Sequence, residues 1–134
     1  MSTLEEIREY FRTDFQQCGH TVDAVGPGTA TVREAVSEGH LRPGGTVSGP
    51  VMMSVADCAM YAAIFSSLGI IPLAVTTNLN INFLRRPQAG ADILGKCTLL
   101  KIGKKLVIGE VHIYSEGDDA PVAHATATYA LPPG

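Results

Sequence analysis

One long apolar segment, from Val51 to Ile71, constrains the fold of this chain more than any other feature. Polar or small residues interrupt it at five positions: Ser54, Asp57, Ser66, Ser67 and Gly69. These interruptions make the segment a poor membrane span, whereas a helix that is apolar on most sides is one that is buried on most sides. We therefore predict a buried central helix over residues 48–68. Ser48 is a suitable N-cap, and Pro50 falls in the first turn, where its missing N–H costs nothing.

The remaining segments predict one short helix and several strands. A capping-box pattern and apolar residues at helical spacing predict a helix within residues 1–18. Residues 38–47 are rich in Gly and Pro and predict an irregular loop before the central helix. Strands are predicted over 21–25, 29–36, 75–84, 91–102, 106–114 and 121–131. These segments lie between turns, and they are apolar, rich in β-branched residues, or alternate between apolar and polar residues. The last four strands are joined by short turns, so we expect them to form an antiparallel meander.

This order of elements predicts an α+β fold in which a curved antiparallel sheet wraps around the long central helix, the arrangement called a hotdog fold. The chain has 134 residues, and 46% of them are hydrophobic, which suits a single domain over residues 1–134 with a packed core. An exposed sheet edge or helix face would favour assembly of two or more copies, so we expect a homodimer or homotetramer.

Composition excludes several classes of partner. The net charge is −3 and no basic block is present, which argues against nucleic acid. The cysteines Cys18, Cys58 and Cys97 are odd in number and irregularly spaced, which predicts neither a disulfide framework nor a zinc site. The first residues carry acidic side chains and do not resemble a signal peptide. We expect a soluble, cytoplasmic protein that does not bind membranes.

Asp57 is the residue that most suggests chemistry. A carboxylate in the middle of an apolar helix is costly unless it is paired, hydrogen-bonded or protonated, and burial alone leaves a structural role as plausible as a functional one. At the start of the same helix, Gly49 offers a backbone N–H at the positive end of the helix dipole, where it could stabilise an oxyanion or simply take part in capping. Eight residues of helix span roughly 12 Å, so one carbonyl cannot touch both groups within one chain. Two antiparallel central helices across a two-fold axis could bring Gly49 of one chain to Asp57 of the other.

Three segments carry a family resemblance: SGPVMMSVADCAMYAAI, AVTTNLNINFLRRPQAG, and the stretch from DILGKC to YAL. They resemble the hotdog acyl-CoA thioesterases of the phenylacetyl-CoA and hydroxybenzoyl-CoA type, over nearly the whole chain after residue 19. The resemblance implies that Gly49 donates its N–H to the thioester carbonyl and that Asp57 of the opposite subunit acts as nucleophile or general base. It further implies that Thr76 or Thr77 assists the attacking water. Coenzyme A would be part of the substrate, with no separate cofactor and no metal.

The resemblance also suggests residues that bind the substrate. Ser48 replaces the His of the family's His-Gly-Gly motif, and Arg42 or His40 stands where the family often carries an amide. Further candidates are Met53 for the acyl pocket, and Arg85, Arg86 and Lys104 for the phosphates of coenzyme A. For each of these four, a role in the core or as a solvated charge is an equal alternative. His112 and His124 are expected to have a role on the sheet surface or in the core rather than in catalysis.

Two other functions fit the same fold. The altered motif Ser48-Gly49-Pro50 is compatible with a hotdog protein that binds acyl-CoA without turnover. A hydratase or dehydratase acting on an acyl thioester would need a His near the start of the central helix, where only His40 is present. The acyl group, the choice between dimer and tetramer, and the choice between coenzyme A and an acyl carrier protein are left open by the sequence.

Overall fold

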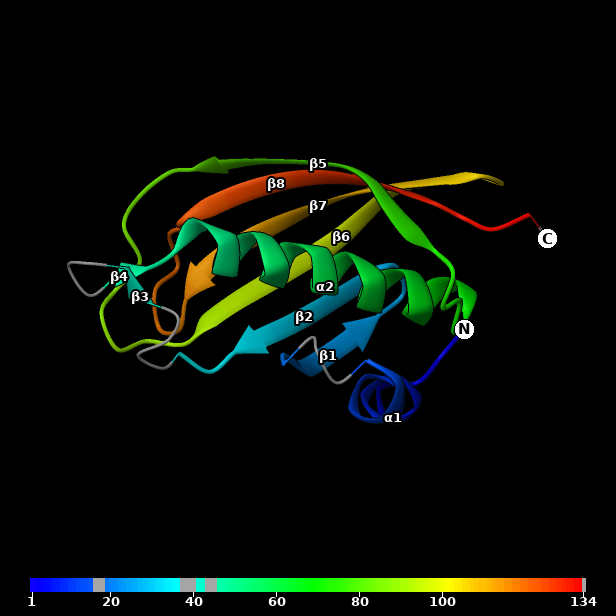
Figure 1. The fold of residues 1–134 in the computed structure, drawn as a ribbon, viewed down its shortest axis with the longest axis horizontal. Coiled ribbons are helices and arrows are strands. Elements are labelled where there is room, and N and C mark those ends of the chain that lie inside the picture. The colour runs from blue at the N-terminus through cyan, green and yellow to red at the C-terminus, as the bar shows by residue number, and fades with distance from the viewer. Residues whose placement is uncertain (16–18, 37–40, 43–45, 134) are drawn as a thin grey trace.

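The chain folds into a curved six-stranded antiparallel sheet around one long helix (Figure 1). This computed structural model describes residues 1–15, 19–36, 41–42 and 46–133. The helices are α1 (Leu4–Asp14) and α2 (Gly49–Leu68). The strands of the main sheet are β1 (Thr21–Gly26), β2 (Thr29–Glu34), β5 (Val75–Phe83), β6 (Ile93–Ile102), β7 (Leu106–Ser115) and β8 (Ala123–Ala130). The predicted α+β hotdog fold is confirmed, including the short N-terminal helix.

The order of strands in the sheet is β1-β2-β6-β7-β8-β5, and it corrects one prediction. Strands β6, β7 and β8 form a meander, but β5 pairs with β8 and not with β6, which follows it in sequence. Strand β6 has two edges: β7 pairs with one, and β2 of the first hairpin pairs with the other. No edge of β6 is therefore left for β5. β5 therefore lies at an edge of the sheet.

A second correction concerns the segment before α2, which was predicted to be irregular. Two short strands, β3 (Leu41–Arg42) and β4 (Thr46–Val47), pair there as a small antiparallel ladder. The ladder leads into Ser48, which is the N-cap of α2. The backbone of Ser48 is extended, as expected for an N-cap. The Ser48 side chain makes no capping hydrogen bond, although a Ser at the N-cap was predicted to make one.

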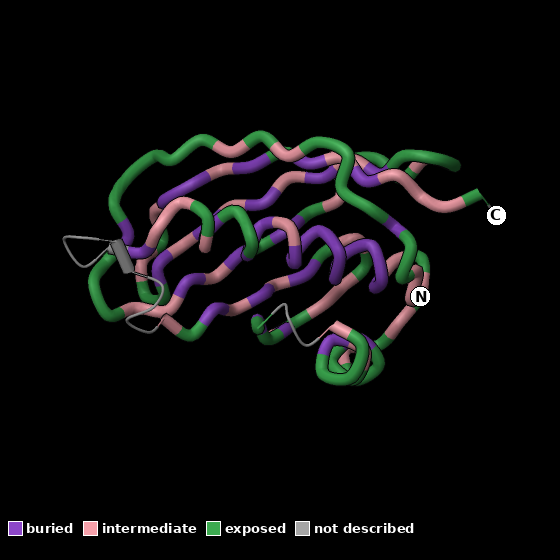
Figure 2. Tube along the Cα trace, in the orientation of Figure 1, coloured by how far each residue is buried: buried purple, intermediate pink, exposed green. Residues whose placement is uncertain are grey.

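Helix α2 lies along the concave face of the sheet, and most of it is buried (Figure 2). By length and composition α2 could cross a membrane, but 67% of its most apolar window is buried inside this fold. Two glycines on the sheet allow the close approach. A Cβ added at Gly95 would lie 2.6 Å from Val55 Cγ1, and one added at Gly109 would lie 2.6 Å from Met60 Sδ. Such distances are far below van der Waals contact, so a side chain at either position would push helix and sheet apart.

Helix α1 begins with the predicted capping box. The hydroxyl of Thr3 accepts from the Glu6 backbone N–H, and the Glu6 carboxylate accepts from the Thr3 backbone N–H. The helix packs through the buried side chains of Ile7 and Phe11. It ends at Asp14, earlier than predicted, and residues 16–18 lie outside the described part of the chain.

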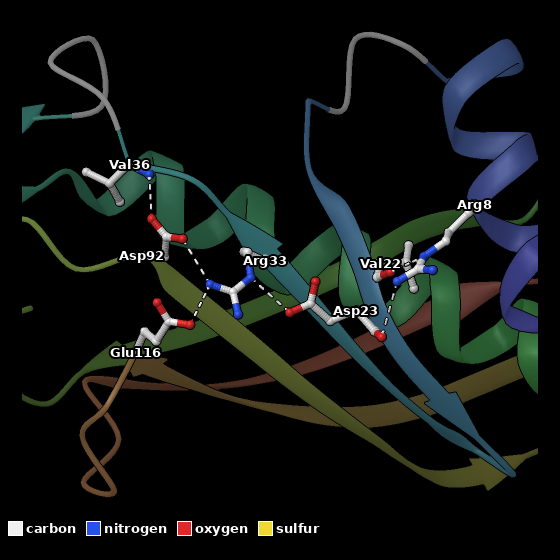
Figure 3. Close-up of polar contacts among 7 residues, drawn as sticks. All are labelled: Arg8, Val22, Asp23, Arg33, Val36, Asp92 and Glu116. Carbon is white, nitrogen blue, oxygen red and sulfur yellow. Dashed lines mark hydrogen bonds and ion pairs between the residues drawn. The ribbon is translucent and has the colours of Figure 1, made fainter.

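On the convex face, Arg33 joins segments that are far apart in sequence (Figure 3). Its guanidinium forms ion pairs with Asp23 on β1, with Asp92 just before β6, and with Glu116 just after β7, at 2.9, 2.9 and 2.7 Å. Asp92 also accepts a hydrogen bond from the backbone N–H of Val36. These carboxylates, Glu116 first, raise the pKa of Arg33 further above its usual range. The cluster ties the first hairpin to the meander.

Candidate active site

The carboxylate of Asp57 is held by two hydroxyl groups from the sheet. Thr76 donates from Oγ1 to Asp57 Oδ1 at 2.5 Å, and the Tyr129 hydroxyl donates to the same oxygen at 2.7 Å. The Tyr129 hydroxyl also lies 3.0 Å from the backbone carbonyl oxygen of Asp57. Among the described residues, the structure gives Oδ2 no hydrogen bond. This half-buried carboxylate therefore has one oxygen fixed and one available to a substrate or a water.

Strand pairing explains why these two hydroxyls meet at Asp57. Thr76 on β5 and Tyr129 on β8 are direct partners in the antiparallel register, so both side chains point from the sheet toward α2. Tyr129 is buried, and burial, followed by the nearby charge of Asp57, raises the pKa of its phenol well above the usual range. Tyr129 therefore stays protonated and donates a hydrogen bond at any pH of interest.

Tyr129 was not identified as a site residue from the sequence. Its position in the last strand could have indicated a role in the site. The inward face of β8 carries Ala123, Ala125 and Ala127, and then Tyr129, all of them buried. A single hydroxyl at the end of an otherwise apolar face needs a buried partner, and Asp57 is that partner.

The structure separates the two threonines that were predicted as alternatives. Thr76 contacts Asp57, whereas Thr77 donates its hydroxyl to the backbone carbonyl of Thr128 at 3.2 Å. The register of β5 with β8 is irregular between Thr76 and Asn78, and Thr77 lies in this irregularity with its hydroxyl on the β8 backbone. The structure does not bring Thr77 to the carboxylate.

Gly49 is the first residue of α2, and it lies at the opposite end of β5 from Asp57. A Cβ added at Gly49 would lie 3.2 Å from the ring of Phe83, the last residue of β5, whereas Asp57 contacts Thr76 near the first. The eight-residue spacing on one straight helix keeps the two groups apart within one chain. The Gly49 N–H lies in the first turn, where an amide has no partner within the helix.

None of the other predicted residues whose side chains the structure describes forms a hydrogen bond or an ion pair with Asp57. Met53 is on α2 and is 40% exposed. Arg85 and Arg86 are exposed just after β5, and Lys104 is exposed in the turn between β6 and β7. His40 lies outside the described residues, and for Arg42 only the backbone, in β3, is described.

An open cleft of about 940 Å³ lies at the same end of the sheet as Thr76. It is located between the C-terminal end of α2, the turn between β6 and β7, and the segment after β8. Lys104 and Lys105 line it together with Leu68, Ile71, Leu106, Ala130, Leu131, Pro132 and Pro133. Because Ala130 pairs with Val75, the cleft is close to the start of β5.

A second polar cluster on α2 also went undetected in the sequence. Ser54 Oγ lies 2.8 Å from Nε2 of the buried His20, and His20 Nδ1 lies 3.3 Å from the buried carboxylate of Glu34. Ser54 precedes Asp57 by less than one helical turn but faces the first hairpin. The cluster joins α2 to the residue before β1 and to β2, which lie at the opposite end of the sheet order from β8 and β5.

The sequence profile of the thioesterase superfamily matches residues 44–122, which is more than half of the chain. The chain belongs to the thioesterase superfamily. The matched range contains Gly49, Asp57 and Thr76, and it ends before Tyr129. No curated protein matches the chain.

Solved structures place this thioesterase among close relatives. A candidate thioesterase from Silicibacter sp. TM1040 is 44% identical, with 98% of this chain and 92% of that chain covered and a TM-score of 0.90. Zebrafish thioesterase superfamily member 2 is 25% identical over 98% of this chain and 100% of its own, with a TM-score of 0.85. A variant of the phenylacetic acid degradation protein PaaI from Thermus thermophilus is 25% identical, over 88% and 97% of the two chains, with a TM-score of 0.74. Membership of this superfamily identifies the protein as a thioester hydrolase.

Proposed function

We propose that this thioesterase hydrolyses a coenzyme A thioester with an aryl or medium-chain acyl group, at a site shared between two subunits. The observation that carries the proposal is the carboxylate of Asp57. Thr76 and Tyr129 fix its Oδ1, and Oδ2 is left for chemistry. A structural carboxylate would be expected to have both oxygens satisfied, as those of Asp92 are by Arg33 and Val36.

The edge strand β5 supports the shared site. It pairs on one side only, and its exposed apolar residues include Val75 and Phe83, at 55% and 51% exposure. Such an edge favours pairing with a second strand. If β5 pairs antiparallel with its copy so that Leu79 meets the partner's Leu79, then Val75 lies opposite the partner's Phe83.

This pairing brings the two halves of the site together. Phe83 contacts Gly49, and Thr76 contacts Asp57, at opposite ends of the same strand. Antiparallel pairing of two β5 strands would therefore place the partner's Gly49 beside Asp57. The dimer would contain two such sites, one at each end of the paired strands. The roughly 12 Å that separates the two residues along one helix is then no obstacle.

In the proposed reaction, a water bound to Asp57 Oδ2 gives its proton to the carboxylate as its oxygen attacks the thioester carbonyl carbon. The carbonyl oxygen becomes an oxyanion, which accepts a hydrogen bond from the backbone N–H of the partner's Gly49 at the positive end of the helix. When the oxyanion collapses, the carbon–sulfur bond breaks. The departing thiolate takes up the proton, giving the free acid and the thiol of coenzyme A. Direct attack by Asp57 through an anhydride would use the same groups.

Charges around the site are suited to the phosphates of coenzyme A. Lys104 and Lys105 line the cleft at the Thr76 end of β5. Within one chain, Arg85 lies beyond the other end of that strand, roughly 30 Å from Thr76 for nine residues at 3.3 Å each. In the proposed antiparallel pair, the partner's Arg85 lies near the end of β5 where Lys104 and Lys105 line the cleft. Cations of both subunits would then surround this cleft.

The experiment is thiol release from a panel of aryl and aliphatic coenzyme A esters, with Asp57→Asn and Asp57→Ala beside the wild type. Asp118→Asn is the matched control, because this carboxylate is distant from α2 in the turn after β7. We expect both Asp57 variants to lose at least about a hundredfold in kcat/KM and the control to lose none.

Circular dichroism would show that the variants remain folded. No thiol release from any ester by the wild type would contradict the proposed substrate class. Full activity of Asp57→Ala would keep the reaction class and remove Asp57 from the mechanism.

A further inference from the structure

Three potential metal ligands lie together on the convex face of the sheet, on the other side from α2 and Asp57. His112 on β7 and His124 on β8 are direct partners in the antiparallel register. Glu110 lies two residues before His112 and points to the same face. All three side chains are partly buried. Glu110 and His124 are 14 residues apart in sequence, so only the pairing of β7 with β8 brings the set together.

The distances within the set are close to those of a metal centre. His124 Nε2 lies 3.4 Å from Glu110 Oε2, and the rings of His112 and His124 are 4.7 Å apart between centroids. One ligand atom of each residue lies within 4.8 Å of the others. Two ligands of a tetrahedral Zn²⁺, each at about 2.0–2.2 Å from the ion, are separated by roughly 3.3–3.6 Å. One pair is already at that separation, and rotation of the His112 ring would bring in the third ligand.

The strand partners of the three residues bring little positive charge that would compete with a cation. In the described strands, the direct partners of the three residues on β6, β8 and β5 are Lys96, Thr98, Thr126 and Asn82. Lys96 is the one cation among them, and its ammonium lies over the ring of Tyr114, 5.0 Å from the centroid. The carboxylate of Glu110 therefore faces two imidazoles and neutral side chains.

We propose that Glu110, His112 and His124 bind one Zn²⁺ ion per chain, with water as the fourth ligand. Two imidazoles and one carboxylate form a typical donor set for zinc. The ion would join β7 to β8 and stabilise the folded state, since a ligand that binds only the native protein raises its stability. The site is separate from the proposed thioesterase centre, because the sheet lies between them. The proposal differs from the prediction that this chain binds no metal. That prediction rested on the absence of cysteine and histidine clusters in the sequence, whereas this set is assembled by the pairing of β7 with β8.

The test is a titration of EDTA-treated, dialysed protein with zinc chloride, followed by calorimetry and by thermal unfolding. We expect one Zn²⁺ per chain and an unfolding temperature that rises with zinc concentration. His112→Gln, His124→Gln and Glu110→Gln should each weaken binding by at least about tenfold and abolish the thermal shift. Asp118→Asn and Asp119→Asn, which remove carboxylates from the turn after β7, should leave both unchanged. Substitution with Co²⁺ should give the intense visible absorption of a tetrahedral site, which the three Gln variants should lose.

Two outcomes would overturn the proposal. One is no stoichiometric binding of Zn²⁺ by the wild type. The other is binding that the three Gln variants retain, which would show that zinc binds elsewhere on the surface. Because the glutamine side chains are polar and these positions are only partly buried, the variants should fold. Their unfolding temperatures without zinc, compared with that of the wild type in EDTA, check this directly.

Discussion

At the scale of single residues, the site depends on how one carboxylate is held. Asp57 could be predicted from the sequence, because a charge inside an apolar helix stands out. Its partners could be predicted only in part. Thr76 and Thr77 were equivalent candidates until the register of β5 with β8 was known. Tyr129 was missed, because 72 residues separate it from Asp57 in sequence and no local pattern links the two.

The two threonines give a matched pair of variants. Thr76→Val removes a hydroxyl that donates to Asp57, whereas Thr77→Val removes one that donates to a backbone carbonyl. We expect Thr76→Val to lower kcat/KM by about ten- to a hundredfold and Thr77→Val to change it by less than about threefold. The measurement is thiol release by the two variants at equal concentration of folded protein. Equal losses in both would show that the hydroxyl on Asp57 has no special role.

Cys97 allows a prediction on pH and stability. Burial raises the pKa of its thiol from an ordinary value of 9.0 to about 12. The folded state therefore keeps the thiol neutral where the unfolded chain ionises it. The resulting stabilisation is complete below pH 9 and is lost as the pH rises toward 12.

Cys97→Ala cannot ionise at this position, so it serves as the reference. The difference in free energy of unfolding between wild type and this variant should shrink by about 2 kcal/mol between about pH 8 and about pH 10.5. Urea unfolding at several pH values would measure it. The other two cysteines are present in both proteins and cancel. A difference that stays constant with pH would show that the folded and unfolded thiols ionise alike.

At the scale of the elements, the fold depends on how closely α2 approaches the sheet. The helix itself could be predicted almost to its ends, because twenty residues that are all apolar or small except Asp57 have few alternatives. The order of the strands could not. Sequence neighbours usually pair, and nothing in the sequence of β5 reveals that β2 already occupies the edge of β6 that it would otherwise take.

Gly95 tests the close approach. A methyl group there would meet Val55 Cγ1 at 2.6 Å, and the backbone carbonyl of Val55 is only 3.5 Å away. Since a β-branched side chain on a packed helix has little freedom to move, Gly95→Ala should destabilise the protein by about 1–3 kcal/mol. Lys96→Ala, on the convex face of the same strand, removes only an exposed contact with the ring of Tyr114 and should cost less than about 1 kcal/mol. Chemical denaturation of both variants would decide, and equal effects would contradict the packing argument.

At the scale of the whole molecule, the proposed activity depends on association of two chains. Gly49 and Asp57 are at opposite ends of β5, and β5 is an exposed edge strand. The spacing on the helix predicted that a site using both would need a second copy. The exposed edge of β5 supports the arrangement proposed above, in which antiparallel pairing of two β5 strands would bring each Asp57 to the partner's Gly49.

The most direct test of this shared site is subunit complementation. Asp57→Asn removes the carboxylate, and Gly49→Pro removes the backbone N–H at a helix position that accommodates proline. Each homodimer should be nearly inactive. A heterodimer, purified through two different tags, would contain one doubly defective site and one intact site.

If the two subunits share each site, the heterodimer should recover about half of the wild-type rate of thiol release per dimer. Activity that stays at the level of the single variants would show that Gly49 and Asp57 of one chain serve the same site, in contradiction to the proposed arrangement.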